Sequence, residues 1–307
     1  MDTNIDRPVF LVGTGRCGST MLYSLLGQHP DLAFTTGFLA HWPDRPAWHR
    51  LALRTVDCPV VGPWLQSRLL HGEPWTYWNH HVPGFAEPMR DMRGSDLTVS
   101  ARKGVERALA EIPAGRRQRV FVKFTGWTRV ELIGEVCPDA RVVHVVRNPR
   151  AVANSLLAQP WWCGWRGPTA WRWGELSAGE RRTWEKHDRG FEVLAAIQWK
   201  KIVEAFQQSL QREPSLREHV TSVRYDRLCD DLPGTIGQIL AFCQLRHDAQ
   251  FTRAVEQFAV RSGEDKWRSN LNEQQQQRLT SAIAELELDR LWQDDEALGV
   301  TPRGKVR

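Results

Sequence analysis

Short apolar runs alternate along the chain with longer stretches in which apolar side chains recur at helical spacing. The short runs, at 9–12, 120–127, 141–146 and 220–225, have the length of buried strands. The periodic stretches predict helices, which lie at 19–26, 102–112, 129–140, 151–157, 189–210, 233–243 and 273–288. Strands that alternate with helices form right-handed crossovers between parallel neighbours. The pattern therefore predicts an α/β fold with three layers, α/β/α, around a central parallel sheet.

The loop between the first strand and the first helix carries three glycines. Glycine lets successive backbone N–H groups point into one concavity, and the start of the next helix adds further unpaired N–H groups. Such a loop can bind a phosphate, although an ordinary glycine-rich turn is the alternative. Gly13, Gly18 and Thr20 match most of the Walker pattern G-x-x-x-x-G-K-[ST], but Ser19 stands at the lysine position. The strong cation of this P-loop-like turn is Arg16.

A second strand–turn–helix unit also delivers a cation. The strand at 141–146 ends in Arg147, and a helix follows at 151–157. In magnesium-dependent nucleotide hydrolases the corresponding strand commonly ends in an aspartate that holds the metal. Two strands that both end near arginines instead predict a ligand with two separate anionic groups, bound without a metal ion.

Two motifs together resemble the sulfotransferases that use 3′-phosphoadenosine 5′-phosphosulfate (PAPS). They are G-x-x-R-C-G-S-T at 13–20 and V-V-R-N-P-R-A-V-A-N-S at 145–155. The resemblance implies transfer of a sulfonate group from PAPS to an acceptor hydroxyl, which leaves 3′-phosphoadenosine 5′-phosphate (PAP). It also implies that Arg147 and Ser155, eight positions apart, bind the 3′-phosphate. The first loop would bind the 5′-phosphosulfate through Gly15, Arg16, Cys17, Gly18, Ser19 and Thr20.

The resemblance extends to weaker positions elsewhere in the chain. Lys123 lies in an apolar strand, where a buried ammonium needs an anionic partner, and the matching lysine of cytosolic sulfotransferases contacts the sulfonate. Thr125 replaces the catalytic histidine that those enzymes carry two residues later. Tyr225 is the candidate neighbour of the adenine, and Lys266 or Arg268 would close over the cofactor's phosphates.

The expected catalytic groups are two cations and a base. Arg16, assisted by Lys123, would stabilise the charge that develops on the oxygen between phosphorus and sulfur. The base stays open, because the glutamate that follows the first helix in several sulfotransferase branches is absent here. His41 and Asp44 are the first candidates, since they follow the first helix most closely. Further candidates in the same region are His49, His80 and His81.

Two segments are expected to cover the acceptor within a single domain over 1–307. Residues 35–95 lack a clean period but are rich in Trp, Pro and His, which predicts short helices, because disordered segments are poor in aromatic residues. Residues 158–185 hold a cluster of tryptophans. Indole faces stack on sugars and on hydrophobic or aromatic molecules, but they also pack long loops onto a domain. Both interpretations stay open at this stage.

The amino-acid composition limits the kinds of ligand and partner that we expect. The net charge of +5 suits an anionic cofactor or an acidic acceptor and is too small to indicate nucleic acid. Six scattered cysteines have no metal-ligand spacing, which predicts reduced thiols and no metal. The first strand begins too early for a secretory signal, and no apolar run approaches the roughly twenty residues of a membrane span. We expect a cytoplasmic enzyme with a small-molecule or glycan acceptor; its oligomeric state is not predicted.

Two other functions fit part of the sequence. A P-loop nucleotide kinase or NTPase would explain the first motif, but it requires the Walker lysine and an acidic metal ligand. A non-catalytic glycan-binding protein on a sulfotransferase-like fold would explain the tryptophans. Magnesium-dependent turnover of ATP would indicate the first, and binding of an acceptor without sulfonate transfer would indicate the second.

Overall fold

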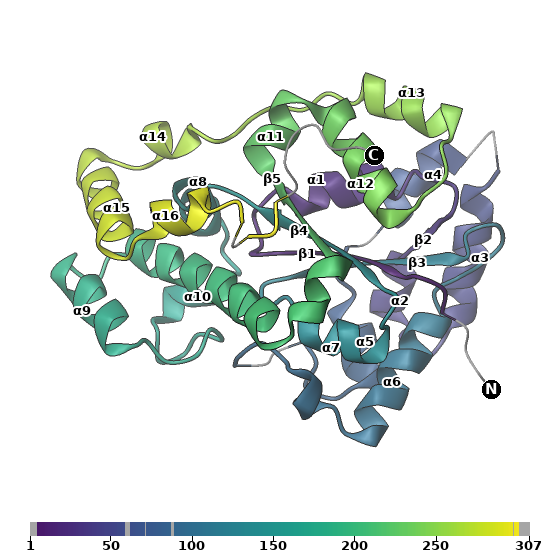
Figure 1. Ribbon diagram of the computed structural model, residues 1–307, viewed down its shortest axis with the longest axis horizontal. Helices are drawn as coiled ribbons and strands as arrows, with labels where there is room; N and C mark the ends of the chain where they lie inside the picture. Colours follow the sequence, from purple (N-terminus) through teal and green to yellow (C-terminus); the bar gives the residue numbers. More distant parts are fainter. Residues whose placement is uncertain (1–4, 59–61, 71, 87–88, 297, 301–307) are drawn as a thin grey trace.

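The computed structural model describes residues 5–58, 62–70, 72–86, 89–296 and 298–300. Within these ranges, five parallel strands form one sheet in the order β2-β3-β1-β4-β5, with helices on both faces (Figure 1). The predicted α/β fold with a central parallel sheet is therefore confirmed. The strands are β1 (Val9–Gly13), β2 (Leu32–Phe34), β3 (Arg119–Thr125), β4 (Arg141–Val146) and β5 (Val220–Arg224).

The strand register brings the ends of the central strands together. All five residues of β1 are buried, as expected for a strand that is covered on both faces. Gly13 lies opposite Thr125 of β3 on one side and opposite Val145 of β4 on the other. Arg147 follows β4 directly, and Tyr225 follows β5 at the next position along this edge. The loops that leave these strands therefore begin side by side.

Helices from both halves of the chain cover the sheet. Figure 1 shows α1 and α12 on one face and α5, α6 and α7 on the other. The helices in the first half of the chain are α1 (Ser19–Leu26), α2 (Gly37–His41), α3 (Pro46–Val56), α4 (Gly62–Leu69), α5 (Trp75–His81), α6 (Val99–Ala110), α7 (Val130–Val136) and α8 (Pro149–Leu157). Those in the second half are α9 (Ala178–Lys186), α10 (Phe191–Arg212), α11 (Tyr225–Asp230), α12 (Leu232–Cys243), α13 (Ala249–Gln257), α14 (Lys266–Asn270), α15 (Glu273–Glu285) and α16 (Leu288–Gln293).

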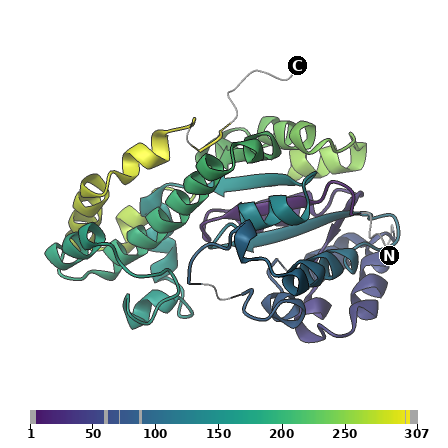
Figure 2. The same cartoon turned by 60° about the horizontal axis from the view of Figure 1, so that its bottom comes forward.

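A second hydrophobic cluster lies beyond the carboxyl ends of the strands. It joins α8, α10, α15 and α16, which are grouped at one end of the molecule in both views (Figures 1 and 2). The buried stripe of α10 supplies much of it, as its helical periodicity predicts. Trp199 of α10 also donates a hydrogen bond from Nε1 to the carbonyl of Arg147, at 3.0 Å. This cluster therefore fixes the start of the turn after β4.

The structure corrects several predicted elements. Strand β2 has three residues and was too short to stand out as an apolar run. Helix α9 begins inside the segment 158–185 and ends one residue beyond it, and its signal in the sequence is a capping box between Ser177 and Glu180. Tyr225 begins α11 and does not end a strand as predicted. The predicted short helices between 35 and 95 are present as α2 to α5.

Two absences concern membranes and metals. Within the described ranges, no helix has the length and apolar character that a membrane span requires. In the same ranges, His, Cys, Asp and Glu side chains do not gather in a group of three that would hold a metal ion.

The close packing at the end of β1 predicts a large effect of Gly13→Ala. A Cβ at Gly13 would lie 2.5 Å from the carbonyl oxygen of Val145 and 2.7 Å from Sγ of Cys17. We expect a loss of about 1–3 kcal/mol in the free energy of unfolding, measured by urea titration. Gly237→Ala in α12 is the control, because a Cβ there would meet no atom within 4 Å and should not destabilise the protein. Equal stability of the two variants would contradict this account of the sheet edge.

Candidate active site

The loop after β1 folds into a concave turn of backbone amides. Gly15, Arg16 and Gly18 have positive φ angles of 76°, 55° and 90°, which successive glycines allow and which an arginine adopts at a cost. Leu22 donates the hydrogen bond that closes the first turn of α1, to the carbonyl of Gly18. The amides of residues 19–21 precede that bond and have no partner within the helix. The loop and the helix start thus present donors to an anion.

Arg147 ties the turn after β4 to this loop. Its Nη1 donates to the carbonyl oxygen of Arg16 at 3.1 Å, and its guanidinium lies 4.4 Å from the centroid of the Tyr225 ring. Arg16 in turn donates from Nε to Oγ of Ser155 on α8, at 2.9 Å. The structure therefore gathers four residues that the sequence placed at the cofactor: Arg16, Arg147, Ser155 and Tyr225.

Arg16 and Arg147 bring two positive charges close together in this cluster. Partial burial, followed by the neighbouring Arg147 charge, lowers the pKa of Arg16 below its usual value. Arg147 is mostly buried, and its Nε donates to a carboxylate oxygen of Glu264 at 2.6 Å. Two close guanidinium groups repel each other, so this place favours an anion.

Tyr225 covers the loop from the β5 side. A Cβ at Gly18 would lie 2.3 Å from the ring carbon Cδ2 of Tyr225, so glycine is required for this close approach. Burial raises the pKa of the Tyr225 hydroxyl to about 12, which keeps it protonated at neutral pH. The ring thus forms an uncharged wall beside the guanidinium of Arg147.

Lys123 forms a second group on the other side of the loop. It is 4 % exposed, and its Nζ donates to Oγ1 of Thr20 at 3.0 Å. A carboxylate oxygen of Glu73 lies 4.0 Å from the same Nζ and accepts a hydrogen bond from the hydroxyl of Thr125. Gly72 allows this approach, since a Cβ there would lie 2.6 Å from Nζ. The lysine is therefore held between the loop and a carboxylate.

Glu73 is the site residue that sequence reasoning missed. It lies between α4 and α5, in the part of the chain without a clean hydrophobic period, where no strand end marks it. The available signal was chemical: a lysine and a threonine at the end of an apolar strand need an anionic partner. The fold brings this partner from fifty positions earlier than Lys123.

His41, Asp44 and His49, which the sequence suggests as catalytic bases, each have partners outside the loop. His41 bonds through Nδ1 to the carbonyl of Gly37 at 2.8 Å, and Asp44 pairs with the exposed Arg45 at 3.7 Å. In the described part of the chain, neither side chain forms a hydrogen bond or ion pair with Lys123. His49 is buried between Thr36 and the carbonyl of Ile112, and burial lowers its pKa to about 4.

Of the other histidines proposed as bases, His81 pairs with a carboxylate oxygen of Glu111 at 3.2 Å. The neighbouring His80 packs against it, with the ring centroids 5.2 Å apart. Both belong to α5, which follows Glu73 closely in the chain.

The basic segment near residue 266 lies next to Arg147. A Cβ at Gly263 would be 3.1 Å from Nη2 of Arg147 and 3.6 Å from Cδ of Lys266. Helix α14 also packs against α8, which carries Ser155. Arg268 stacks on Trp267 at 4.5 Å and lies 3.5 Å from Asp265.

Parts of both predicted covering segments meet near the carboxyl end of β3. A Cβ at Gly126 would lie 2.7 Å from the indole of Trp173, and one at Gly174 would lie 3.2 Å from the carbonyl of Met89. Trp173 also packs against Trp127, with ring centroids 5.4 Å apart, and its Nε1 is buried without a hydrogen-bond partner. A tryptophan with a spare N–H therefore lies over the residue that follows Thr125.

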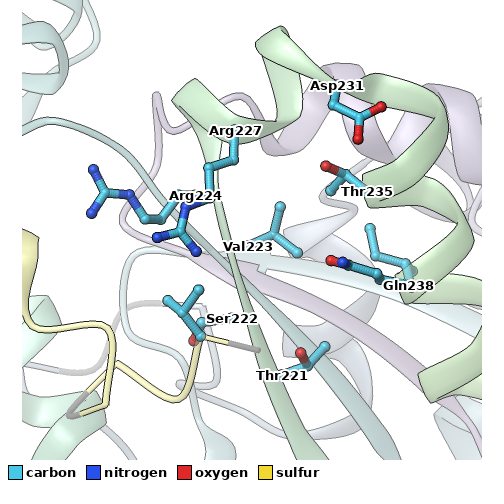
Figure 3. Close-up of a pocket in the computed structure, with 10 residues that line it drawn as sticks. Thr221, Ser222, Val223, Arg224, Arg227, Asp231, Thr235 and Gln238 are labelled. Carbon is cyan, nitrogen blue, oxygen red and sulfur yellow. The ribbon is translucent and has the colours of Figure 1, made fainter. Parts of the chain in front are cut away.

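A separate hollow of about 50 Å³ lies beside β5 (Figure 3). Two arginines line it, but both are paired: Arg224 contacts Asp226 at 2.9 Å and Asp295 at 3.4 Å, and Arg227 contacts Asp295. No residue of the two motifs lines this hollow. The loop and its two flanking groups are therefore the better candidate site.

Comparison with solved structures shows the fold. A sulfotransferase from Mycobacterium avium, STF9, is 16% identical, with a TM-score of 0.52, over 93% of this chain and 77% of that protein. STF1 from Mycobacterium tuberculosis H37Rv gives 18% identity and a TM-score of 0.45, covering 91% and 78%. Mouse SULT7A1, solved in complex with PAP, gives 13% and 0.44, covering 91% and 84%.

Sequence comparison gives the family. No curated protein matches this chain significantly. The model of the sulfotransferase family matches residues 8–249, which is most of the chain and includes both motifs and the segment that carries Glu73. The chain belongs to the sulfotransferase family.

Proposed function

We propose that this sulfotransferase moves a sulfonate group from PAPS to the hydroxyl of a small-molecule or glycan acceptor. One observation carries the proposal: two cations on opposite sides of the 13–20 loop are each hydrogen-bonded to the loop itself. Arg147 bonds to the carbonyl of Arg16 at 3.1 Å, and Lys123 bonds to the hydroxyl of Thr20 at 3.0 Å. PAPS carries two anionic groups, and this arrangement offers one cation for each.

The Arg147 side would hold the 3′-phosphate. Arg147 and Ser155 are linked through Arg16, so all three can face one anion. A guanidinium suits the bidentate contact that a phosphate accepts, and a hydroxyl donates one more hydrogen bond. The amides of Cys17, Gly18, Ser19 and Thr20, with that of Gly15, would hold the 5′-phosphate. Tyr225 would lie near the adenine, and Lys266 or Arg268 would close over the phosphates.

The Lys123 side would stabilise the leaving group. The acceptor oxygen forms a bond to sulfur while the bond from sulfur to the phosphate oxygen breaks, and the electron pair stays on the phosphate. A cation at that oxygen stabilises the transition state more than the ground state. Lys123 would take this role, supported by its hydrogen bond to Thr20 of the loop, and Arg16 is our second cation for it.

Glu73 is our candidate for the base and takes precedence over His41 and Asp44. A hydroxyl loses its proton as it attacks, and a carboxylate within reach of the reacting centre can accept that proton. The contacts of Glu73 support this role, because its carboxylate lies 4.0 Å from Lys123 Nζ and accepts a hydrogen bond from the hydroxyl of Thr125. The proton would move to Oε2 of Glu73, since Oε1 accepts the hydrogen bond from Thr125.

The acceptor would bind under the two covering segments, 35–95 and 158–185. Trp173 supports this placement, because it lies over Gly126 and keeps an unpaired indole N–H. An indole face binds sugar rings and aromatic alcohols. This favours a carbohydrate or a hydrophobic alcohol.

Arg147→Ala should weaken binding of PAP by about 2 kcal/mol, the usual cost of losing a charged hydrogen-bond partner. Isothermal titration calorimetry measures this difference. Arg150→Ala is the matched control, because Arg150 lies three positions later, in the first turn of α8, and pairs with Asp289 instead of the loop. If PAP binds the Arg147 variant as tightly as it binds the wild type, the assignment of the 3′-phosphate site is wrong.

Glu73→Gln should lower kcat roughly 100-fold or more while the affinity for PAP stays within about twofold, because the base acts on the acceptor. The assay uses labelled PAPS with a panel of phenols and sugars. His41→Ala and Asp44→Asn are the comparison variants and should keep most of the activity. Full activity of Glu73→Gln, with loss in either comparison variant, would return the base to the residues favoured by sequence.

A further inference from the structure

Glu264 is paired with Arg147, the cation that the proposed function assigns to the 3′-phosphate. Its carboxylate accepts a hydrogen bond from Nε of Arg147 at 2.6 Å. Both side chains are mostly buried, with 11% of Arg147 and 17% of Glu264 exposed. The guanidinium has five N–H donors, and this pair uses the Nε edge while Nη1 serves the carbonyl of Arg16. A phosphate that arrives at Arg147 therefore meets a carboxylate already in place.

The segment that carries Glu264 is held by apolar packing at its start, where Phe258 and Val260 contact the core, and by long hydrogen bonds closer to Glu264. Residues 258–265 connect α13 to α14 without regular helix or strand. The hydroxyl of Tyr225 donates to the carbonyl of Arg261 at a long 3.5 Å, and the amide of Glu264 donates to Oγ of Ser262 at 3.4 Å. The short contact with Arg147 is the strongest of these. The hydrogen bond with Arg147 is therefore the main polar contact that positions the Glu264 side chain.

The electrostatics make this carboxylate easy to displace. Burial raises the pKa of Glu264, and the nearby charges of Asp226 and Asp265 raise it further, while Arg147 opposes them. Its charged form is therefore stable here chiefly through Arg147. A phosphate carries nearly two charges and three acceptor oxygens, so it binds a guanidinium more strongly than one carboxylate does.

We propose that Glu264 is an intramolecular competitor of the 3′-phosphate and sets the affinity of the enzyme for its nucleotide. The inference rests on the proposed function. In the empty site Glu264 neutralises Arg147 and limits the repulsion between Arg147 and Arg16. When the nucleotide binds, its 3′-phosphate takes the Nε edge and the carboxylate moves to solvent. When PAP leaves, Glu264 returns to Arg147 and lowers the free energy of the empty enzyme, which favours product release.

Glu264→Gln tests the competition, because it removes the charge and keeps the shape. We expect the affinity for PAP to rise on the order of tenfold, as for one charge-assisted hydrogen bond that no longer has to be broken. The affinity for AMP, which has a 5′-phosphate and no 3′-phosphate, should not change. Calorimetry with both nucleotides gives the two values, and thermal unfolding without ligand shows whether the variant is folded.

Asp265→Asn is the matched control. It removes the same charge at the next position, but the Asp265 side chain is 85% exposed and contacts Arg268 instead of Arg147. Its affinity for PAP should stay within about twofold of the wild type, because an exposed charge is screened by solvent. An equal gain in both variants would mean that net charge near the site matters and that the contact with Arg147 does not.

Three further results would overturn the inference, and one of them also concerns the proposed function. Unchanged affinity of Glu264→Gln for PAP would show that no competition exists. Weaker binding would show that Glu264 orients Arg147 for the phosphate and does not compete with it. If the wild type itself fails to bind PAP, the proposed function fails and the inference falls with it.

Discussion

The hydrogen bond from Arg147 to the carbonyl of Arg16 is the contact on which the candidate site depends. It connects the loop after β1 to the turn after β4 across a separation of 131 residues. The parallel register makes it possible, because Gly13 and Val145 lie side by side at the ends of their strands. The bond also fixes Arg16 in a left-handed conformation that an arginine rarely adopts. The sheet thus stabilises a strained loop at the place where an anion would bind.

Each side of the loop pairs a buried cation with a carboxylate. Glu73 lies beside Lys123, and Glu264 lies on Arg147. These two carboxylates compensate charges that would otherwise be buried alone, which is costly in a protein interior. Their proposed roles differ: Glu73 faces the acceptor side, where a proton has to be removed, while Glu264 holds the place of a phosphate. One arrangement of charges can therefore serve both an empty and an occupied site.

Local patterns made most of the fold predictable from the sequence. Strands β1, β3, β4 and β5 are apolar runs, and in α1, α8, α10 and α15 apolar residues recur at helical spacing. Helix α1 also follows a glycine-rich loop. Strand β2 and the short helices α9, α11, α13, α14 and α16 were not predicted, because elements of three to nine residues carry too little local pattern. The cations Arg16, Lys123 and Arg147 could be expected at one edge of the sheet, because Lys123 lies near the end of a strand and the two arginines follow strands. Glu73 and Glu264 could not, since each meets its partner only through the tertiary fold, Glu264 across 117 residues.

The most direct test of the account is the melting temperature of the protein with PAP, with AMP, and with ATP plus magnesium. A ligand that binds the native state raises the melting temperature, and the rise grows with the logarithm of the ratio of ligand concentration to Kd. The account predicts a clearly larger rise with PAP than with AMP at equal concentration, because the 3′-phosphate engages Arg147 and Ser155. A rise with ATP and magnesium alone would contradict it and would indicate a nucleotide kinase or hydrolase.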